Sequence, residues 1–278
     1  MPTLLTTTPT IGPSYTGDGV KRGWRDLGLA LCGNLAQELS LAFDEMFTGA
    51  DSTHPPFARL RTSLRQRTVQ TSEGCLLLSS PGRDNPVKRA LENDFQIASR
   101  IQIMSAYFLP TWRLRHALTK AARRGAQVQL ILPGKTDVPL SSLATQSFYA
   151  RLLRSGVEIF EYQPQILHAK LILIDDIVYA GSANLDARSL GINYELTLRL
   201  TNSHLAAQAH DIFAHDLPLC RRIDLQEWRK SRNVLERLKA RLSYLLLTRL
   251  DPAIARYQWR NIKLRLKALQ KSQQRLDA

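Results

Sequence analysis

The sequence predicts an α/β protein in which helices flank a mixed β-sheet, followed by a basic helical tail. Two observations predict this class. Between residues 73 and 219, short apolar runs typical of buried strands alternate with segments of helical period, and this alternation is characteristic of α/β layered folds. From residue 221 onward, leucines recur at three- and four-residue steps among arginines, which indicates an amphipathic helix.

The expected elements follow in chain order. Alternating leucines at positions 27, 29 and 31 indicate a short strand, and the next residues, 34–47, have helical period. Residues 51–72 are polar and basic and contain Pro55-Pro56, so a linker is expected there. Beyond it, strands are expected over residues 75–80, 100–108, 126–134, 157–162, 168–175, 177–182 and 193–200. Helices are expected over residues 86–100, 112–125 and 141–156.

These elements group into four regions. Residues 1–50 form a partial N-terminal unit, 51–72 a linker, 73–220 the main domain, and 221–278 the tail. A length of 278 residues and a hydrophobic fraction of 44% are sufficient for a substantial core. No apolar run approaches the roughly 18–20 residues of a membrane-spanning helix, and the first ten residues do not resemble a secretory signal.

The cysteines and the charge narrow the function classes. Cys32, Cys75 and Cys220 are far apart, which excludes a disulfide framework or a CxxC metal site and favours a reducing compartment. The net charge of +14 predicts an anionic partner such as nucleic acid, a lipid surface or a phosphorylated substrate. From Arg221 onward there are 16 basic and 5 acidic residues, so 11 of the 14 charges lie in the tail.

An internal repeat relates the two ends of the chain. Residues 24–31 align with residues 193–200 at an offset of 169. In each copy an acidic residue, Asp26 or Glu195, precedes an alternating strand, and an amphipathic helix follows. The pattern predicts a duplication, whose first copy begins where its upstream part would have been.

The chemistry is expected between residues 168 and 195. Side chains alternate along a strand, so His168 and Lys170 share one face and Asp175 takes the other. Ser182 and Asn184 share a side after the following turn. An imidazole beside an ammonium, a hydroxyl and a carboxamide suits a phosphate, because these groups supply charge, directed donors and a nucleophile that titrates near neutrality.

This segment resembles the phospholipase D superfamily signature, HxK followed by Asp and then GSxN. The matching residues are His168, Lys170, Asp175, Gly181, Ser182 and Asn184. Flanking segments are similar to the C-terminal half of bacterial cardiolipin synthases and their phospholipase-D-like relatives. Residues 12–29 are similar to the stretch just after the first signature in those enzymes.

The resemblance implies a two-half active site without a metal or other cofactor. His168 would be one of two catalytic histidines, Lys170, Ser182 and Asn184 would bind the phosphate, and Glu195 would orient a catalytic imidazole. Asp26 would do the same for the other half. Asp175 belongs to the catalytic signature, although its role in the family is usually structural.

Simpler interpretations remain open for some of these residues. Glu195 could be a solvated carboxylate at a strand edge, and Asp26 could be a partner of Arg25 or a turn residue. The tail leucines could be a packing face or a membrane-binding face. Gly134-Lys135-Thr136 imitates the end of a P-loop, but Gln129 stands at the position of its first glycine, which favours a strand-end turn.

A second HxK is absent, because none of the other histidines precedes a lysine by two positions; they are His54, His116, His204, His210 and His215. Two chains could pair to complete the site, as in single-signature nucleases of the superfamily. The protein could instead be a truncated, inactive half, or the start could be assigned too late.

The leading expectation is a phosphatidyltransferase or phospholipase acting on anionic phospholipid through a phosphohistidine. The tail would hold it on the inner face of the plasma membrane as a peripheral cytoplasmic protein. A homodimeric nuclease is the second reading, and nucleic acid is the less favoured substrate because of the leucine stripe. A non-catalytic membrane-binding module is the third.

Overall fold

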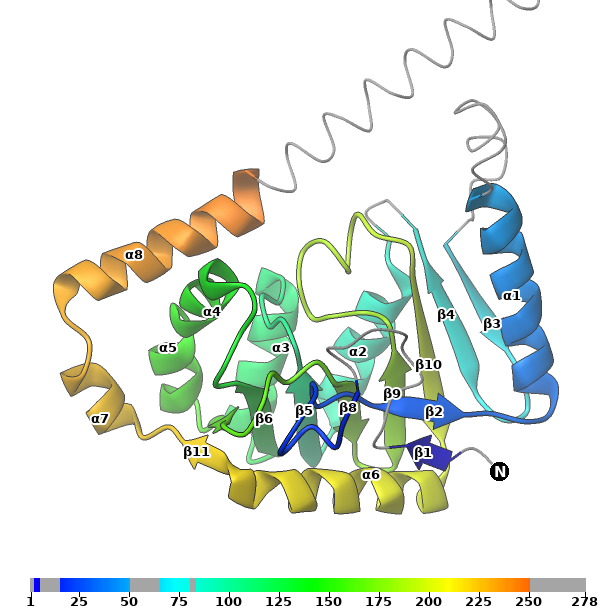
Figure 1. The fold of residues 1–278 in the computed structure, drawn as a ribbon, viewed down its shortest axis with the longest axis horizontal. Helices are drawn as coiled ribbons and strands as arrows, with labels where there is room; N and C mark the ends of the chain where they lie inside the picture. The colour runs from blue at the N-terminus through cyan, green and yellow to red at the C-terminus, as the bar shows by residue number, and fades with distance from the viewer. Residues whose placement is uncertain (1–2, 6–15, 51–65, 81–83, 251–278) are drawn as a thin grey trace, which may run out of the picture.

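A computed structural model describes residues 3–5, 16–50, 66–80 and 84–250 (Figure 1). The strands within these ranges are β1 (Thr3–Leu5), β2 (Gly28–Ala30), β3 (Arg67–Gln70), β4 (Cys75–Ser79), β5 (Arg100–Ser105), β6 (Gln127–Pro133), β7 (Glu158–Tyr162), β8 (Lys170–Ile174), β9 (Ile177–Gly181), β10 (Glu195–Thr201) and β11 (Cys220–Arg222). The α-helices are α1 (Asn34–Ala50), α2 (Pro86–Ile97), α3 (Trp112–Arg123), α4 (Pro139–Gln146), α5 (Tyr149–Arg154), α6 (Ser203–Asp216), α7 (Leu225–Lys230) and α8 (Val234–Leu245). A 3₁₀ turn (Leu217–Leu219) follows α6, and a π-helical turn (Leu246–Leu250) follows α8.

The described strands form one large mixed sheet and one small pair. The large sheet has the order β11-β7-β6-β5-β8-β9-β10-β4-β3, and β1 pairs with β2 apart from it. Strands β5, β6 and β7 are mutually parallel, whereas the remaining neighbours are antiparallel. The expectation of a mixed sheet flanked by helices is confirmed.

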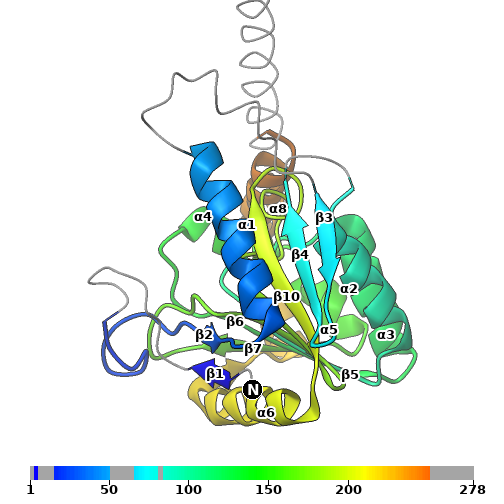
Figure 2. The same cartoon turned by 90° about the vertical axis from the view of Figure 1, so that its right-hand side faces the viewer.

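Helices cover both faces of the large sheet (Figures 1 and 2). Alternation along the strands divides the core accordingly: Leu77 of β4 packs with α2–α5, whereas Leu76 and Leu78 pack with α1 and α6. A strand with helices on both faces is apolar along its whole length, and all five residues of β4 are buried. The continuous apolar runs in the sequence therefore correspond to the centre of a three-layer structure.

Local sequence signals set the helix ends. The side chain of Asn85 accepts a hydrogen bond from Lys88 N at 3.0 Å, and Pro86 occupies the first turn of α2, as expected for a capped helix start. Helix α3 ends just before Gly125, whose φ of +99° lies in the region that favours glycine.

Three expectations about elements are wrong. The helix expected over residues 141–156 is two helices, α4 and α5. Ser147 Oγ donates to the carbonyl of Ala144 at 2.6 Å, and Phe148 N bonds to Thr145 O. These three-residue bonds replace the α-helical pattern and turn buried Phe148 into the core.

The other two differences lie at opposite edges of the sheet. The end of the expected linker is strand β3, which pairs with β4 and gives its backbone groups a partner. The start of the expected helical tail is strand β11, which pairs with β7. Arg221 bonds to Glu161 at 2.6 Å and Arg222 to Glu158 at 2.8 Å, so charge pairs accompany this register. Residues 51–65 and 251–278 of the two regions lie outside the described part.

The repeat has a counterpart in the elements. Helix α6 begins at Ser203 and α1 begins at Asn34, a separation of 203 − 34 = 169 residues, which is the offset seen in the sequence. A strand precedes each helix, β10 in one case and β2 in the other. The two copies differ in position, because β10 lies inside the large sheet and β2 lies outside it.

No helix within residues 16–50, 66–80 and 84–250 is both long enough and apolar enough to cross a membrane.

Candidate active site

The strand register gathers the predicted site residues at one end of the sheet. Strand β8 pairs antiparallel with β9, and β9 pairs antiparallel with β10, with Gly181 opposite Thr197. The start of β8, the end of β9 and the start of β10 therefore lie side by side. Lys170, Gly181 and Glu195 occupy these three strand ends.

A segment from the first repeat copy lies against this end of the sheet. Arg25 N donates to Ile166 O at 2.8 Å, and His168 N donates to Arg25 O at 2.7 Å. The Arg25 side chain forms a buried ion pair with Asp216 of α6, with Nε and Oδ2 2.7 Å apart. These contacts fix the position of the next residue, Asp26.

Asp26 is the hydrogen-bond partner of His168. His168 Nδ1 lies 2.7 Å from Asp26 Oδ2, and Leu27 N donates to the other carboxylate oxygen at 2.8 Å. The indole ring of Trp24 packs on the imidazole, with ring centroids 5.3 Å apart. Because an ionised carboxylate can only accept, Nδ1 is the donor in this contact, and the tautomer that fits it has its lone pair on Nε2. The arrangement suits nucleophilic attack by Nε2.

Lys170 places a cation beside the imidazole. Its Nζ donates to the His168 carbonyl at 2.6 Å and lies 3.2 Å from His168 Nδ1 and 3.4 Å from Nε2. Burial lowers the pKa of Lys170, and the carboxylates of Asp26, Glu195 and Asp186 oppose that shift. A partly desolvated ammonium next to the nucleophile can hold a phosphate oxygen and stabilise developing negative charge.

Glu195 holds a hydroxyl and an amide. Ser182 Oγ donates to Glu195 Oε2 at 2.5 Å, and Asn193 Nδ2 donates to Oε1 at 3.0 Å. The backbone approach is close here, since a Cβ on Gly181 would lie 2.2 Å from Leu196 O, and only glycine fits.

Asn184 is half-buried in the same loop, and its Oδ1 has no hydrogen-bond partner among the described residues. The Nδ2 group of the same amide is a donor that a phosphate oxygen can accept from.

Asp175 does not join this cluster. It lies in the turn after β8, at the opposite end of that strand from Lys170. Its carboxylate accepts hydrogen bonds from Ser99 N at 3.2 Å and from Arg100 N at 2.8 Å. The grouping of Asp175 with His168 as a catalytic residue is therefore not reproduced in space, because the carboxylate caps the start of β5.

The acid that bonds His168 is Asp26 and not Glu195. The sequence assigns Glu195 to a catalytic imidazole and Asp26 to the other half of the site. In the structure, the first-copy acid Asp26 bonds the second-copy histidine. Sequence reasoning also missed Trp24, Asn193 and the Arg25–Asp216 pair. The adjacency of Trp24, Arg25 and Asp26 was the available signal, but nothing in it identified His168 as the partner.

The other described histidines lie elsewhere. His116 stacks on Trp112 of α3, and the remaining three are in α6: His204, His210 and His215. His168 is therefore the one histidine of this cluster among the described residues. No group of three or more His, Cys, Asp or Glu side chains is arranged to hold a metal ion in the part of the chain that the structure describes.

The fold and the site together define a class. Residues 95–217 match a family model described as "Cardiolipin synthase, PLD-like domain". Residues 95–217 therefore form a phospholipase-D-like domain of the cardiolipin synthase type.

Two curated relatives are cardiolipin synthases from bacteria. Cardiolipin synthase A of Pseudomonas syringae pv. syringae (strain B728a) is 33% identical over 227 residues, which is 80% of this chain and 46% of that protein. Cardiolipin synthase A of Escherichia coli O139:H28 (strain E24377A / ETEC) is 31% identical, with the same two shares. The chain spans about half the length of the curated relatives it matches.

A solved structure supports the fold alone. Phosphatidylserine synthase of Haemophilus influenzae Rd KW20 superposes with a TM-score of 0.54 at 16% identity. The superposition covers 69% of this chain and 52% of that protein.

Proposed function

We propose that this chain carries one half of a phosphatidyltransferase site that acts on anionic phospholipids, as in cardiolipin synthases. The observation that carries the proposal is the hydrogen bond of 2.7 Å between His168 Nδ1 and Asp26 Oδ2. It places the lone pair on Nε2, beside the Lys170 ammonium. A nucleophile, its orienting acid and a cation for the phosphate therefore lie together.

The proposed reaction has two steps. His168 Nε2 attacks phosphorus of a phospholipid, a P–N bond forms, and the P–O bond to the headgroup alcohol breaks. The leaving oxygen takes a proton from a second imidazole. In the second step an incoming alcohol gives its proton to that imidazole, attacks phosphorus and releases His168. Lys170 and the amide of Asn184 hold the non-bridging oxygens, where negative charge develops.

Glu195 indicates where the second imidazole would bind. Asp26 and Glu195 occupy equivalent positions of the repeat, and Asp26 orients the histidine of the opposite copy. By the same relation, Glu195 would orient a histidine belonging to the first copy. In the described structure, Ser182 and Asn193 donate hydrogen bonds to this carboxylate.

A lipid substrate is supported by the outer face of α8. Leu235, Leu238 and Leu242 are 58%, 59% and 64% exposed. The stripe is thus a surface in the described structure and not the packing face that its periodicity also allowed. Apolar side chains presented outward beside arginines are typical of helices that lie on membranes.

Basic side chains gather next to this stripe. A cavity of about 380 Å³ between α4–α5 and α7–α8 is lined by six arginines and one glutamate, together with uncharged residues. The arginines are Arg151, Arg154, Arg229, Arg232, Arg237 and Arg241. The combination favours an anionic lipid surface, with the protein peripheral on the cytoplasmic side.

The homodimeric nuclease is less well supported. A dimer in which each His168 took its acid from the partner chain would leave Asp26 without this role. His168 takes Asp26 of its own chain, so that position is already filled. We therefore favour a second histidine that is contributed by the first-copy signature and not by a second His168.

Trapping the intermediate tests the proposal. The full chain is mixed with vesicles containing phosphatidylglycerol, quenched in alkali and examined by mass spectrometry for a phosphatidyl adduct on His168. Added imidazole can stand in for the second histidine. The adduct is expected in the wild type and in His116→Ala, and not in His168→Ala. Transfer that persists in His168→Ala, or no adduct and no transfer with imidazole present, would contradict the proposal.

A further inference from the structure

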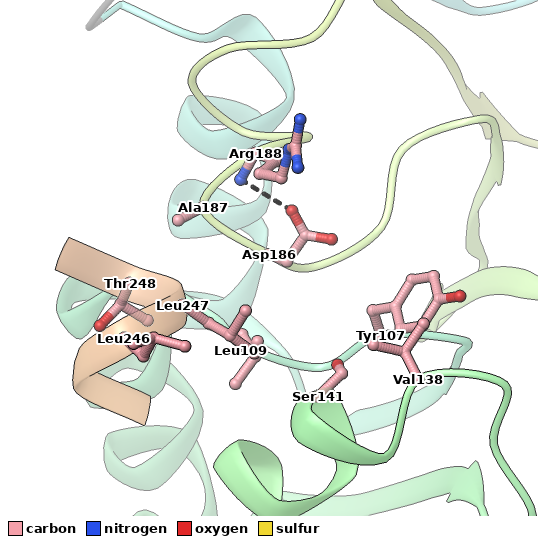
Figure 3. A pocket seen from close by; sticks show the side chains of 10 residues that line it. All are labelled: Tyr107, Leu109, Val138, Ser141, Asp186, Ala187, Arg188, Leu246, Leu247 and Thr248. Atoms are coloured by element: carbon pink, nitrogen blue, oxygen red, sulfur yellow. Dashed lines mark hydrogen bonds between the residues drawn. The ribbon is translucent and has the colours of Figure 1, made fainter. Parts of the chain in front are cut away.

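An apolar cavity lies beside the phosphate site, beneath the C-terminal end of α8. Its volume is about 560 Å³, within the range of roughly 300–1,000 Å³ usual for small-molecule pockets. Figure 3 shows its lining: Tyr107, Leu109, Val138, Ser141, Asp186, Ala187, Arg188, Leu246, Leu247 and Thr248. These residues come from the loop after β5, the start of α4, the loop between β9 and β10, and the turn after α8.

The cavity has an apolar body and a polar end. Leu246 and Leu247 approach Leu109 on one side in Figure 3, whereas Asp186 and Arg188 lie together on another. The Asp186 carboxylate accepts hydrogen bonds from Arg188 N and Ser189 N, each at 2.8 Å. A ligand that fits this lining is an extended apolar chain with a polar group at one end.

The polar end is continuous with the candidate active site. Asp186 is two residues beyond Asn184 in the same loop, and its charge acts on the Lys170 ammonium. The neighbouring residue, Leu185, accepts a hydrogen bond from Leu109 N at 2.8 Å. Tyr107 is two residues beyond Ser105, which pairs with Lys170 across the sheet. The cavity and the phosphate site thus share a loop and a strand end.

The other end of the cavity reaches the leucine stripe of α8. Leu242 is 64% exposed on that helix, and Leu246, one turn later, is 43% exposed and also lines the cavity. Ala240 and Ser243, on the opposite face, are buried. An apolar path therefore runs from the surface that faces lipid into the cavity.

We propose that this cavity receives one acyl chain of the phospholipid whose phosphate binds at His168 and Lys170. The inference rests on the proposed function and adds a specificity element to it. Leu246, Leu247 and Thr248 form one wall of the chain site, so the tail would contribute to substrate selection as well as to membrane attachment. Each methylene buried in the cavity strengthens binding about fourfold.

The test uses water-soluble phospholipids below their micelle concentrations. Binding of dibutyryl- and dihexanoyl-phosphatidylglycerol to the full chain is measured by calorimetry. Two additional methylenes in one buried chain, at about fourfold each, predict a preference of roughly 15-fold for dihexanoyl lipid. Val138→Trp places an indole in the cavity from a position that is 38% exposed, and it is expected to reduce this preference to below twofold. Ile97→Trp, at a site 78% exposed on α2, is the matched control and should keep the preference.

A second pair separates the cavity from the membrane surface. Leu246→Asn and Leu242→Asn remove equal apolar groups from the same helix face, but only Leu246 lines the cavity. The chain-length preference should fall in Leu246→Asn and persist in Leu242→Asn. Equal preferences in the wild type, or an unchanged preference in both Val138→Trp and Leu246→Asn, would overturn the inference.

A headgroup measurement keeps the two proposals distinguishable. Glycerophosphoglycerol has no acyl chains, and Lys170→Gln should abolish its binding if the phosphate site is correctly placed. One outcome is that Lys170→Gln abolishes this binding while Val138→Trp leaves the chain-length preference unchanged. The acyl-chain site would then be wrong, and the phosphate site would stand. The other outcome is that Val138→Trp reduces the preference while Lys170→Gln leaves the binding of glycerophosphoglycerol unchanged. The phosphate site would then be wrong, and so would the inference, because it places the phosphate of the bound lipid at Lys170.

Discussion

Asp26 and Glu195 occupy equivalent positions of a repeat but have different partners. Asp26 holds the imidazole of His168, whereas Glu195 holds the hydroxyl of Ser182 and the amide of Asn193. Both side chains are largely buried. The difference therefore reflects which groups face each carboxylate and not how far each is exposed to water.

The comparison shows how an active site can be shared across a repeat. Asp26 of the first copy serves the histidine of the second copy, so this acid–histidine pair needs residues from both copies. Asp26 is hydrogen-bonded to His168, which lies 142 residues further along the chain. Glu195 marks the corresponding place for the other half. Separate substitutions of Asp26 and Glu195 can test whether the two acids have different roles.

The largest effect is expected from Asp26→Asn. An amide in place of the carboxylate no longer selects the imidazole tautomer with a lone pair on Nε2, and in an analogous acid–histidine pair this costs about 10⁴ in rate. Transfer from phosphatidylglycerol should fall by about 10³–10⁴-fold. Glu195→Gln, assayed in parallel, should lower it far less. Equal losses in both variants would remove the asymmetry between the two acids.

The next effect concerns stability, because Asp26 depends on the buried pair behind it. Arg25→Met removes the buried guanidinium from Asp216 and leaves only the exposed His215 beside the carboxylate, and breaking a buried pair costs about 3–5 kcal/mol. Urea unfolding should show this loss. The double variant Arg25→Met/Asp216→Leu should recover much of it. If the single variant is as stable as the wild type, the anchoring role assigned to Arg25 is wrong.

Glu195 itself is expected to matter for chemical rescue. Added imidazole accelerates transfer if it binds where the second histidine would be, and Glu195 would orient it there. Glu195→Ala should remove most of this acceleration, on the order of tenfold, and leave the reaction without imidazole nearly unchanged. Rescue of equal size in both proteins would show that Glu195 does not mark the second site.

A pH dependence of binding is expected from Lys170. Its pKa is lowered by burial, and only the protonated form attracts a phosphodiester. Affinity for glycerophosphoglycerol should be full below the lowered pKa and decline as the pH rises through it, at a lower pH than an ordinary lysine would require. Lys170→Arg should shift the decline upward, since guanidinium stays charged. A decline unchanged in Lys170→Arg would assign the titration to another group.

The smallest effect is expected at the tail. Leu238→Asn removes one side chain of the exposed stripe and should weaken binding to anionic vesicles several-fold. Flotation with anionic and neutral vesicles measures it. Ile97→Asn, an exposed change on α2, should have no effect. Equal binding to both vesicle types would contradict the membrane role of α8.

The sequence predicted the layered fold because strands buried on both faces contain continuous apolar runs, as residues 75–78 of β4 show. It also predicted the cluster at His168, since His168, Lys170 and Asn184 lie within 17 consecutive residues. The strands at the two sheet edges were not predictable in this way. Strand β3 is polar and half-exposed and exists because β4 offers it backbone partners.

The pairing of His168 with Asp26 could not be predicted from the sequence either. Two acids stand at equivalent repeat positions, and spacing alone cannot decide which faces His168. The decision comes from the Arg25–Asp216 pair, which brings the first copy against α6. The acyl-chain cavity depends similarly on α8 packing against α4, a contact that no local pattern encodes.

The tautomer of His168 tests the central claim most directly. In the neutral wild-type protein, ¹⁵N NMR of the ring should show the proton on Nδ1 and the lone pair on Nε2. Asp26→Ala should shift the ring toward the Nε2–H form that predominates in free histidine. A wild-type ring already protonated on Nε2 would contradict the account, because His168 would then have no lone pair available for the phosphate.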